Sequence, residues 1–575
     1  MPYNKLNNLL GWLCFIIAAT TYTLTLEPSV SFWDCGEFIS CAYRLQVSHQ
    51  PGYPLFAMIG KVFSLLSFGD RTKVAYFTNL CSAIASAATV MFLFWSITAL
   101  AKKMTAGLYR TTSKSRYIVV LGAGFVGAMA FTFSDTFWFS AVETIVFALS
   151  MLCIAVVFWA MLKWEVRADE PGADRWLVFI AYVMGLSIGI HLLNLLTIPA
   201  LTMIYYYRRG KNVTFKKGLG VLLLGIILLA LVQYGIIQYT VKFAGWFDFY
   251  FVNTLGLGFG SGAIVFFALL IGLIVWGIVY SIRRKKYYLN LGLLCLSFLY
   301  LGYSNFAYVP IRATANPTLN NSHPDNAFTL AGYLNRVQYT PSPLLYGPYF
   351  DGKFVEAKDG ETLYRKGEKR YEPTGKKQSY TYDHNTIFPR MFSNDGDDPG
   401  FYRQWMQMSE DHTPNFADNM GFMFSWQIYQ MYFRYFLWNF VGRYNDMDGQ
   451  QSTAALDGNW TSGIFDGMKH LPKSVTESVS YSPLYGLPLI LGLLGMYYHF
   501  KNKKRDALII TLLWFFTGIA IVLYVNQPSI QPRERDYSYV GSFYAFCIWI
   551  GIGVVGLAHL LKSKFDEKKA TYIAI

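Results

Sequence analysis

The chain has 575 residues, of which 54% are hydrophobic and only 15% are charged. Soluble domains carry about 25% charged residues, so this composition excludes an ordinary soluble protein and indicates an integral membrane protein. The net charge of +14 does not indicate nucleic-acid binding, because the basic residues form short clusters at the ends of apolar segments.

Twelve apolar segments are candidates for helices that cross a bilayer, a crossing that takes roughly 17 to 25 residues. They cover residues 9–26, 74–101, 117–134, 141–162, 176–190, 192–207, 218–241, 262–282, 288–308, 483–500, 506–526 and 541–561. The run from Trp176 to Tyr207 is too long for one straight span, so we divide it at His191 into two short segments that meet in a turn. The sequence therefore predicts an all-α polytopic membrane protein with about twelve transmembrane helices.

The basic clusters predict the orientation of these spans. The main clusters lie at residues 102–103, 208–209, 283–286 and 503–505. A cytoplasmic N-terminus places all of them on the cytoplasmic side, as the positive-inside rule requires. We therefore expect a multi-pass plasma (inner) membrane protein with an N-terminal transmembrane module (1–308), a large extracytoplasmic, periplasmic loop domain (309–482) and C-terminal transmembrane helices (483–575).

Two elements are expected within the large loop. Asp-Gly steps among alternating polar and apolar residues predict a β-hairpin between Phe350 and Tyr382. Residues 416–440 are aromatic and long enough to be mistaken for a span, but a crossing there would move the basic cluster at 503–505 to the outer side. We therefore expect a helix that lies at the outer membrane surface.

The most unusual polar residues lie in the first outer loop (27–73), in the stretch SFWDCGEFISCAYRLQVSHQPGYPLF. The three-residue spacing of Asp34 and Glu37 places both carboxylates on one face of a helix. His49 precedes a Pro-Gly-Tyr-Pro turn, which ends any helix. Cys35 and Cys41 flank the acidic positions, and their spacing is only weak evidence for a disulfide.

Further polar residues gather at the same expected outer side. They are Glu143, His191, Asn194, Arg312, Arg533, Arg535 and Asp536. Charges at a membrane boundary are costly, so their gathering suggests a shared polar cavity. There a carboxylate could take a proton from an acceptor hydroxyl, and arginines could hold a phosphate leaving group. No metal site or cofactor is expected, because we find no convincing His or Cys ligand spacing, no P-loop and no dinucleotide fingerprint.

Several of these residues also have a purely structural interpretation. Asp34 and Glu37 could cap a short interfacial helix, and Glu143 could favour the dipole of its own helix. His191 could be a satisfied polar residue between packed spans. The run of residues 533–536 could be an ordinary solvated loop.

Several segments together resemble one known family. They are the acidic first loop with its HQPGYPLF turn, FSDTFWFSAVE, GLSIGIHLLNLLTIPAL, YLNRVQYTPSPLLYGP, NFVGRYND and PRERDYSYVGSF. Over nearly its whole length the chain resembles the multi-spanning family called domain-of-unknown-function 2723. That family includes the transmembrane protein 260 O-mannosyltransferases and is similar to the GT-C class of membrane glycosyltransferases.

The resemblance implies a GT-C-like helix bundle and an inverting glycosyltransferase for protein O-glycosylation. Such an enzyme would move a sugar, with mannose expected, from a polyprenyl phosphate to Ser or Thr hydroxyls of exported proteins. It points to Asp34 or Glu37 as the catalytic base. The residues expected to bind the donor phosphate or sugar are His49, Glu143, His191, Asn194, Arg312, Arg533, Arg535 and Asp536. The expected partners are the lipid-linked donor, which is a substrate and no cofactor, the exported acceptor protein and the lipid bilayer.

Two other classes of protein fit part of these observations. A twelve-span transporter would explain the span count and a polar cavity, but the sequence shows neither related halves nor charges at the midplane. A noncatalytic membrane subunit of an export complex is the third interpretation.

Overall fold

The computed structural model describes residues 2–106, 113–339, 342–450, 457–464 and 471–575. Within these residues, eight helical segments are long and apolar enough to cross a membrane. They are Arg71–Met104, Lys114–Thr132, Val146–Arg167, Phe215–Thr254, Ser261–Arg283, Tyr287–Thr314, Lys504–Val525 and Asp536–Leu561. The chain is therefore a multi-pass helical membrane protein, as predicted, while the total of about twelve spans stays a prediction.

The first 314 residues contain the described helices α1 to α14. Their bounds are α1 Tyr3–Leu24, α2 Cys35–Arg44, α3 Pro54–Ser64, α4 Val74–Met104, α5 Lys114–Thr132, α6 Asp135–Val142, α7 Val146–Arg167, α8 Arg175–Ile188, α9 Ile198–Arg209, α10 Phe215–Ala230, α11 Thr240–Phe249, α12 Ser261–Arg283, α13 Tyr287–Tyr303 and α14 Tyr308–Thr314. Short η helices join several of them, among them η1 Leu65–Ser67, η2 Arg71–Lys73 and η3 Leu192–Thr197.

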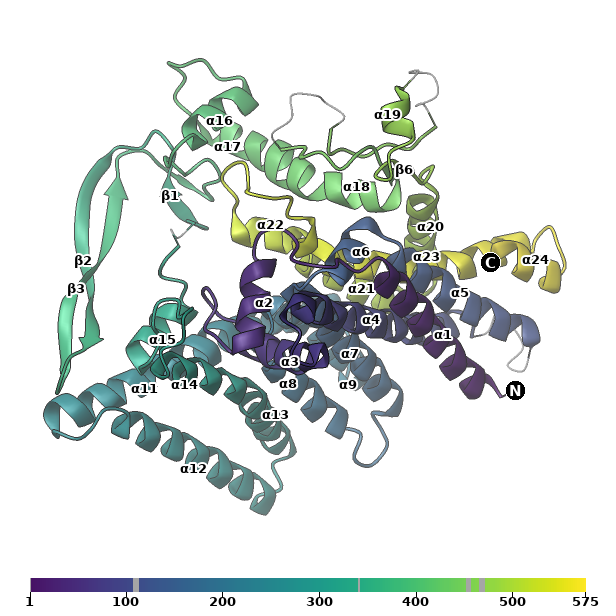
Figure 1. Ribbon diagram of the computed structural model, residues 1–575. Helices are drawn as coiled ribbons and strands as arrows, with labels where there is room; N and C mark the ends of the chain where they lie inside the picture. Colours follow the sequence, from purple (N-terminus) through teal and green to yellow (C-terminus); the bar gives the residue numbers. More distant parts are fainter. Residues whose placement is uncertain (1, 107–112, 340–341, 451–456, 465–470) are drawn as a thin grey trace.

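The remaining residues form the large loop and the C-terminal helices. The loop contains α15 Ala327–Leu334, β1 Tyr346–Pro348, β2 Phe354–Lys366, β3 Tyr371–Tyr382, β4 Asn385–Ile387, α16 Asp398–Met406, α17 Phe416–Phe422, η7 Met423–Phe433, α18 Arg434–Phe440, β5 Gly442–Arg443, α19 Lys473–Thr476 and β6 Ser482–Pro483. After it come α20 Leu487–Asn502, α21 Lys504–Phe516, α22 Ile519–Val525, η9 Asp536–Tyr539, α23 Val540–Leu561 and α24 Glu567–Ala574. In Figure 1, α16 to α19 lie along one side of the helix bundle, and the β2–β3 hairpin extends down to α11.

Helix α23 is the most enclosed span of the bundle. Its residues are apolar on every face, which is the pattern of a helix surrounded by other helices, and all positions from Val540 to Gly556 are buried. Gly495 of α20 lies so close that a Cβ atom there would be 1.8 Å from the carbonyl oxygen of Trp549. Small residues allow such close backbone contact between spans, so glycine is required at this crossing.

The division of the long apolar run at His191 is confirmed. Helix α8 ends at Ile188, and α9 begins only at Ile198 after the short η3 helix. At the end of α9, Arg208 donates a hydrogen bond to the carbonyl oxygen of Glu165 (2.9 Å), near the end of α7. The chain therefore turns between α8 and α9 and returns to the side from which α8 started.

The helical segment Phe215–Thr254 is longer than the span of residues 218–241 predicted for it. Its 40 residues extend about 60 Å at a rise of about 1.5 Å per residue, roughly twice the hydrocarbon thickness of a bilayer. Its far end contacts the hairpin, where Tyr371 donates a hydrogen bond to Asp248 (2.7 Å) and Asn253 donates one to the Tyr371 carbonyl (2.9 Å). Contacts with the hairpin thus stabilise the part of the helix that extends beyond the apolar run.

Both elements predicted within the loop are present. Strands β2 and β3 form an antiparallel hairpin, and residues 416–440 form one helical segment from α17 through η7 to α18. Gln427 in this segment donates hydrogen bonds to Asn526 and Gln527, so it faces protein partners in the loop after α22. The position of this helix relative to the membrane surface stays a prediction.

Arg434 fixes this helix to the last outer loop. Its guanidinium group is completely buried and donates two hydrogen bonds to the Glu534 carboxylate, at 2.8 and 2.6 Å. Tyr435 and Gln450 also donate to Glu534. A buried charge needs such compensation, because removal of one partner leaves the other unpaired in a poorly solvated place.

We expect Glu534→Gln to lower the free energy of unfolding by about 3–5 kcal/mol, because it leaves Arg434 buried without its counter-charge. Denaturant titration of the purified protein in detergent measures this change. The control is Glu372→Gln in the exposed pair with Arg365, which should cost less than about 1 kcal/mol. Equal effects of the two substitutions would contradict the stabilising role of the buried pair.

Candidate active site

The first outer loop folds into the short helix α2 and a tight turn. Asp34 occupies the position before α2, and Glu37 lies in its first turn. Gly52 in the turn has φ +86, and a Cβ atom there would lie 2.6 Å from the ring of Tyr333 in α15. Tyr333 also donates a hydrogen bond to the Ser48 carbonyl. The turn is therefore held against the large loop, which positions His49.

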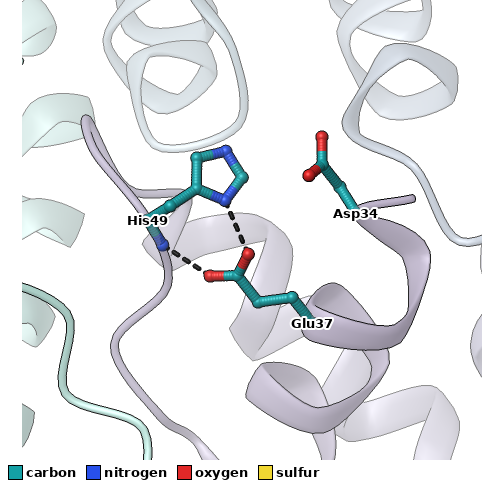
Figure 2. A group of neighbouring side chains, drawn as sticks. All are labelled: Asp34, Glu37 and His49. Atoms are coloured by element: carbon teal, nitrogen blue, oxygen red, sulfur yellow. Dashed lines mark hydrogen bonds and ion pairs between the residues drawn. The ribbon is translucent and has the colours of Figure 1, made fainter. Parts of the chain in front are cut away.

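Glu37 and His49 form a closed pair (Figure 2). The His49 backbone N–H donates to Glu37 Oε1 at 2.6 Å, and His49 Nδ1 lies 2.7 Å from Glu37 Oε2. Burial alone would raise the pKa of Glu37, but its contacts with His49 outweigh this effect and lower that pKa. Tyr53 lies on the other side of the ring, 3.3 Å from Nε2. Glu37 is therefore held as a carboxylate that orients His49.

Asp34 has a different environment. It is half-buried, and among the described residues none donates a hydrogen bond to its carboxylate. Burial raises the pKa of Asp34, and the neighbouring charge of Glu37 raises it further. His49 and the positive charges of Arg533 and Arg535 act in the opposite direction. Asp34 is thus a free carboxylate of raised basicity near two arginines, which is the arrangement expected of a general base.

Glu143 connects the start of α2 to the last outer loop. Its side chain is only 2% exposed and accepts hydrogen bonds from Ser31 Oγ (2.7 Å), Cys35 Sγ (3.4 Å) and Arg533 Nη2 (3.4 Å). Cys35 and Cys41 are both free thiols. Glu143 therefore acts in this structure as the partner that holds Arg533 near Asp34.

Arg535 is the second cation near Asp34. Its Nη2 donates to Gln531 (3.0 Å), whereas its Nε is buried without a hydrogen-bond partner in the described part of the chain. It forms no ion pair with a described carboxylate. A guanidinium group with an unused donor beside a carboxylate can hold an anionic group such as a phosphate.

His191 connects to this group through aromatic contacts, whereas Asn194 does not contact it. The His191 ring packs against Phe147, with ring centroids 4.9 Å apart, and Phe147 in turn contacts Tyr537. Burial lowers the pKa of His191 to about 4, so its imidazole is neutral at neutral pH. Asn194 is fully buried and donates to Ser187 Oγ (3.1 Å). His191 therefore supports the aromatic side chains next to Arg533, and Asn194 fixes the turn between α8 and α9.

Two predicted site residues do not join this group. Asp536 accepts a hydrogen bond from Thr136 (2.7 Å), and Thr136 also accepts one from Asn439 (2.8 Å), so Asp536 belongs to a network that fixes the loop. Arg312 donates to the Leu45 carbonyl (2.6 Å), at the C-terminal end of α2. Asp34 lies at the opposite end of this helix of 10 residues, about 15 Å away along its axis.

Two other residues at the site were missed from the sequence. Tyr53 contacts His49, and Arg336 lies close enough for its charge to act on His191 and Tyr53. Arg336 stacks on Tyr339 and forms no ion pair with a residue that the structure describes. Both residues lie in segments that carried the family resemblance, HQPGYPLF and YLNRVQY. That resemblance was the only sequence feature that could have indicated them.

The group of Asp34, Glu37 and His49 could also hold a metal ion. One potential ligand atom from each of Asp34, Glu37 and His49 lies within 4.8 Å of the others. Carboxylate oxygen and imidazole nitrogen are ordinary ligands of divalent cations. However, the contacts between Glu37 and His49 compete with an ion, because they occupy both carboxylate oxygens of Glu37 and Nδ1 of His49.

Taken together, the described residues form a multi-pass helical membrane protein with a polar site built from the loop after α1 and the loop after α22. Residues 34–214 match the family described as the N-terminal domain of protein O-mannosyl-transferase TMEM260. The resemblance to the transmembrane protein 260 family is therefore confirmed over this N-terminal part. Residues 340–424, which include the hairpin, match a family of unknown function, DUF8416.

Two curated relatives are similar over the same part of the chain. Protein O-mannosyl-transferase TMEM260 of Mus musculus is 31% identical over 185 residues, which cover 32% of this chain and 23% of the relative. Protein O-mannosyl-transferase tmem260 of Dictyostelium discoideum is 27% identical over 188 residues, which cover 32% of this chain and 21% of the relative. The match thus spans less than a quarter of each relative. No solved structure matches the chain significantly.

We expect divalent cations to have little influence on this site, because Glu37 and His49 already satisfy each other. Addition of EDTA should leave the unfolding temperature of the purified protein unchanged, and so should Mn²⁺ or Zn²⁺. A rise in unfolding temperature with either ion that disappears in His49→Ala would contradict this expectation and assign a metal site to the cluster.

Proposed function

We propose that the chain is an inverting membrane glycosyltransferase of the GT-C type that transfers mannose from a polyprenyl phosphate to Ser or Thr hydroxyls of exported proteins. The observation that carries the proposal is the free Asp34 carboxylate beside Arg533 and Arg535, within a segment that matches the N-terminal domain of a protein O-mannosyl-transferase. The positive-inside pattern supports a site on the periplasmic side of the inner membrane.

In the proposed reaction Asp34 is the base. It takes the proton of the acceptor hydroxyl as the oxygen attacks the anomeric carbon of the sugar from the face opposite the phosphate. The new carbon–oxygen bond forms as the bond between the sugar and the phosphate oxygen breaks, so the configuration inverts. The electron pair of the broken bond stays on the lipid phosphate. A carboxylate whose pKa is raised accepts a proton more readily than an ordinary aspartate.

The arginines stabilise the leaving group. Arg535 offers a buried Nε without a protein partner, and Arg533 is held in place by Glu143. Guanidinium groups bind phosphate through parallel hydrogen bonds and stabilise the charge that develops as the sugar leaves. His49, fixed by Glu37, lies on the sugar side of Asp34 in this scheme.

We expect Asp34→Asn to reduce transfer by about 10²–10⁴-fold, the usual contribution of a positioned general base. The assay follows radiolabelled mannose from polyprenyl-phosphate mannose to a Ser/Thr-rich acceptor, with the protein in nanodiscs. Asp70→Asn is the matched control, because Asp70 is a partly exposed carboxylate of the same loop that caps η2 and pairs with Lys73, with no described contact to the site. Full activity of Asp34→Asn, or an equal loss in Asp70→Asn, would overturn the assignment of the base.

The pH dependence gives a second test. The positive charge of Arg535 lowers the pKa of Asp34, so Arg535→Gln should raise that pKa. The base would then be protonated at higher pH, and the acid limb of the kcat/KM profile should move to higher pH. Arg71→Gln, which removes an exposed arginine of the first loop, should leave this limb in place. A shift to lower pH in Arg535→Gln would contradict the proposed electrostatic coupling.

A further inference from the structure

Three cations meet at the C-terminal end of α2, at the end opposite Asp34. Arg44 from α2, Lys61 from α3 and Arg312 from α14 line a cavity of about 510 Å³ together with Tyr43 and Leu45. These residues come from separate segments, so the fold brings them together. We call this group the α2 end pocket.

Two of the cations are fixed by the backbone of α2. Lys61 Nζ donates to the Tyr43 carbonyl (2.6 Å), and Arg312 Nε donates to the Leu45 carbonyl (2.6 Å). Carbonyl groups at a helix C-terminus attract cations, which explains how these side chains are oriented. Each cation still has donors that these contacts do not use, because an ammonium group has three and a guanidinium group five.

The pocket has no negative charge to balance its cations. No carboxylate lines it, and none of Arg44, Lys61 and Arg312 forms an ion pair within the described ranges. The expected orientation places it on the outer side, where short segments are normally poor in Lys and Arg. Three like charges in one place repel one another, and the positive-inside rule also disfavours them on this side. An anionic ligand is the simplest compensation for both.

Apolar side chains beside the pocket indicate where that ligand comes from. Directly after Lys61, three large apolar residues are strongly exposed, namely Val62 (63%), Leu65 (61%) and Phe68 (92%). They belong to the apolar helix of residues 54–67 and its end. Such a contiguous apolar surface next to cations is typical of a helix that lies in the interface between lipid head groups and acyl chains.

We propose that the α2 end pocket binds the phosphate head group of a membrane lipid, at a site separate from Asp34. The lipid phosphate would accept hydrogen bonds from Arg44, Lys61 and Arg312, while its acyl or prenyl chain packs along Val62, Leu65 and Phe68. The lipid is either an anionic phospholipid or a polyprenyl phosphate, since the two present the same phosphate chemistry. The proposal does not depend on the transfer activity.

The test is lipid binding to the full chain in detergent, measured by native mass spectrometry with phosphatidylglycerol, undecaprenyl phosphate and neutral phosphatidylcholine. Arg44→Glu should weaken binding of the anionic lipid by about tenfold. Arg44 is exposed, so this substitution should not disturb folding, which the unfolding temperature verifies. Lys61→Met is a second variant that removes the charge but keeps most of the unbranched side chain.

Arg71→Glu and Asp34→Asn are the controls. Arg71 is an exposed cation of the same loop outside the pocket, so its reversal should change phosphatidylglycerol binding by less than about twofold. Asp34→Asn should also keep that binding, which separates this site from catalysis. Displacement of phosphatidylglycerol by undecaprenyl phosphate would identify the lipid carrier as the ligand, and resistance to displacement would identify the phospholipid.

Three results would overturn the proposal. The first is unchanged anionic-lipid binding in both Arg44→Glu and Lys61→Met. The second is equal binding of phosphatidylcholine, which would show that the head-group charge is irrelevant. The third is binding of inorganic phosphate that depends on Arg44 without any such dependence for the lipids, which would make the pocket a site for a soluble anion.

Discussion

The contact between Glu143 and Arg533 determines how the two ends of the chain build one site. A buried carboxylate is costly unless it is paired and hydrogen-bonded, and Glu143 obtains this compensation from Arg533 and Ser31. Ser31 lies just before α2, and Arg533 lies just before η9. The need to satisfy one buried charge therefore holds the start of α2, and with it Asp34, near the arginines of the last outer loop. Loss of this contact would separate the proposed base from the arginines that are proposed to bind the leaving phosphate.

Much of this arrangement could be predicted because it depends on short sequence distances or on the side of the membrane. The spacing of Asp34 and Glu37 and the turn after His49 are local patterns, and the structure places all three residues in one group. The hairpin was predicted from Asp-Gly steps, although its turn lies between Lys366 and Tyr371 and the step at 359–360 falls at an irregularity within β2. The gathering of Glu143 and Arg533 on one side followed from the order of the spans, since an even number of crossings returns the chain to the same side.

The direction of individual side chains could not be predicted in this way. The expected topology puts Arg312 and Asp536 on the same side as Asp34, but their hydrogen bonds to Leu45 and Thr136 turn them away from it. Arg336 joins the site only because the large loop packs against the turn that carries His49, a contact made through Tyr333. These contacts join residues more than 250 positions apart, and no local pattern in the sequence encodes them.

The two acidic residues of the first loop lie close together but differ in the contacts that surround them. Asp34 and Glu37 share one helix end and one group of neighbours, yet their pKa values move in opposite directions. Glu37 accepts two hydrogen bonds from His49, which favour its ionised form and occupy both of its oxygens. Asp34 has no such partners, and burial raises its pKa.

Pairs of carboxylates whose environments separate their pKa values commonly divide the chemical roles between them. The resemblance to a glycosyltransferase family left the base open between these residues, and their environments favour Asp34 as the group that takes the proton, with Glu37 as the residue that positions His49.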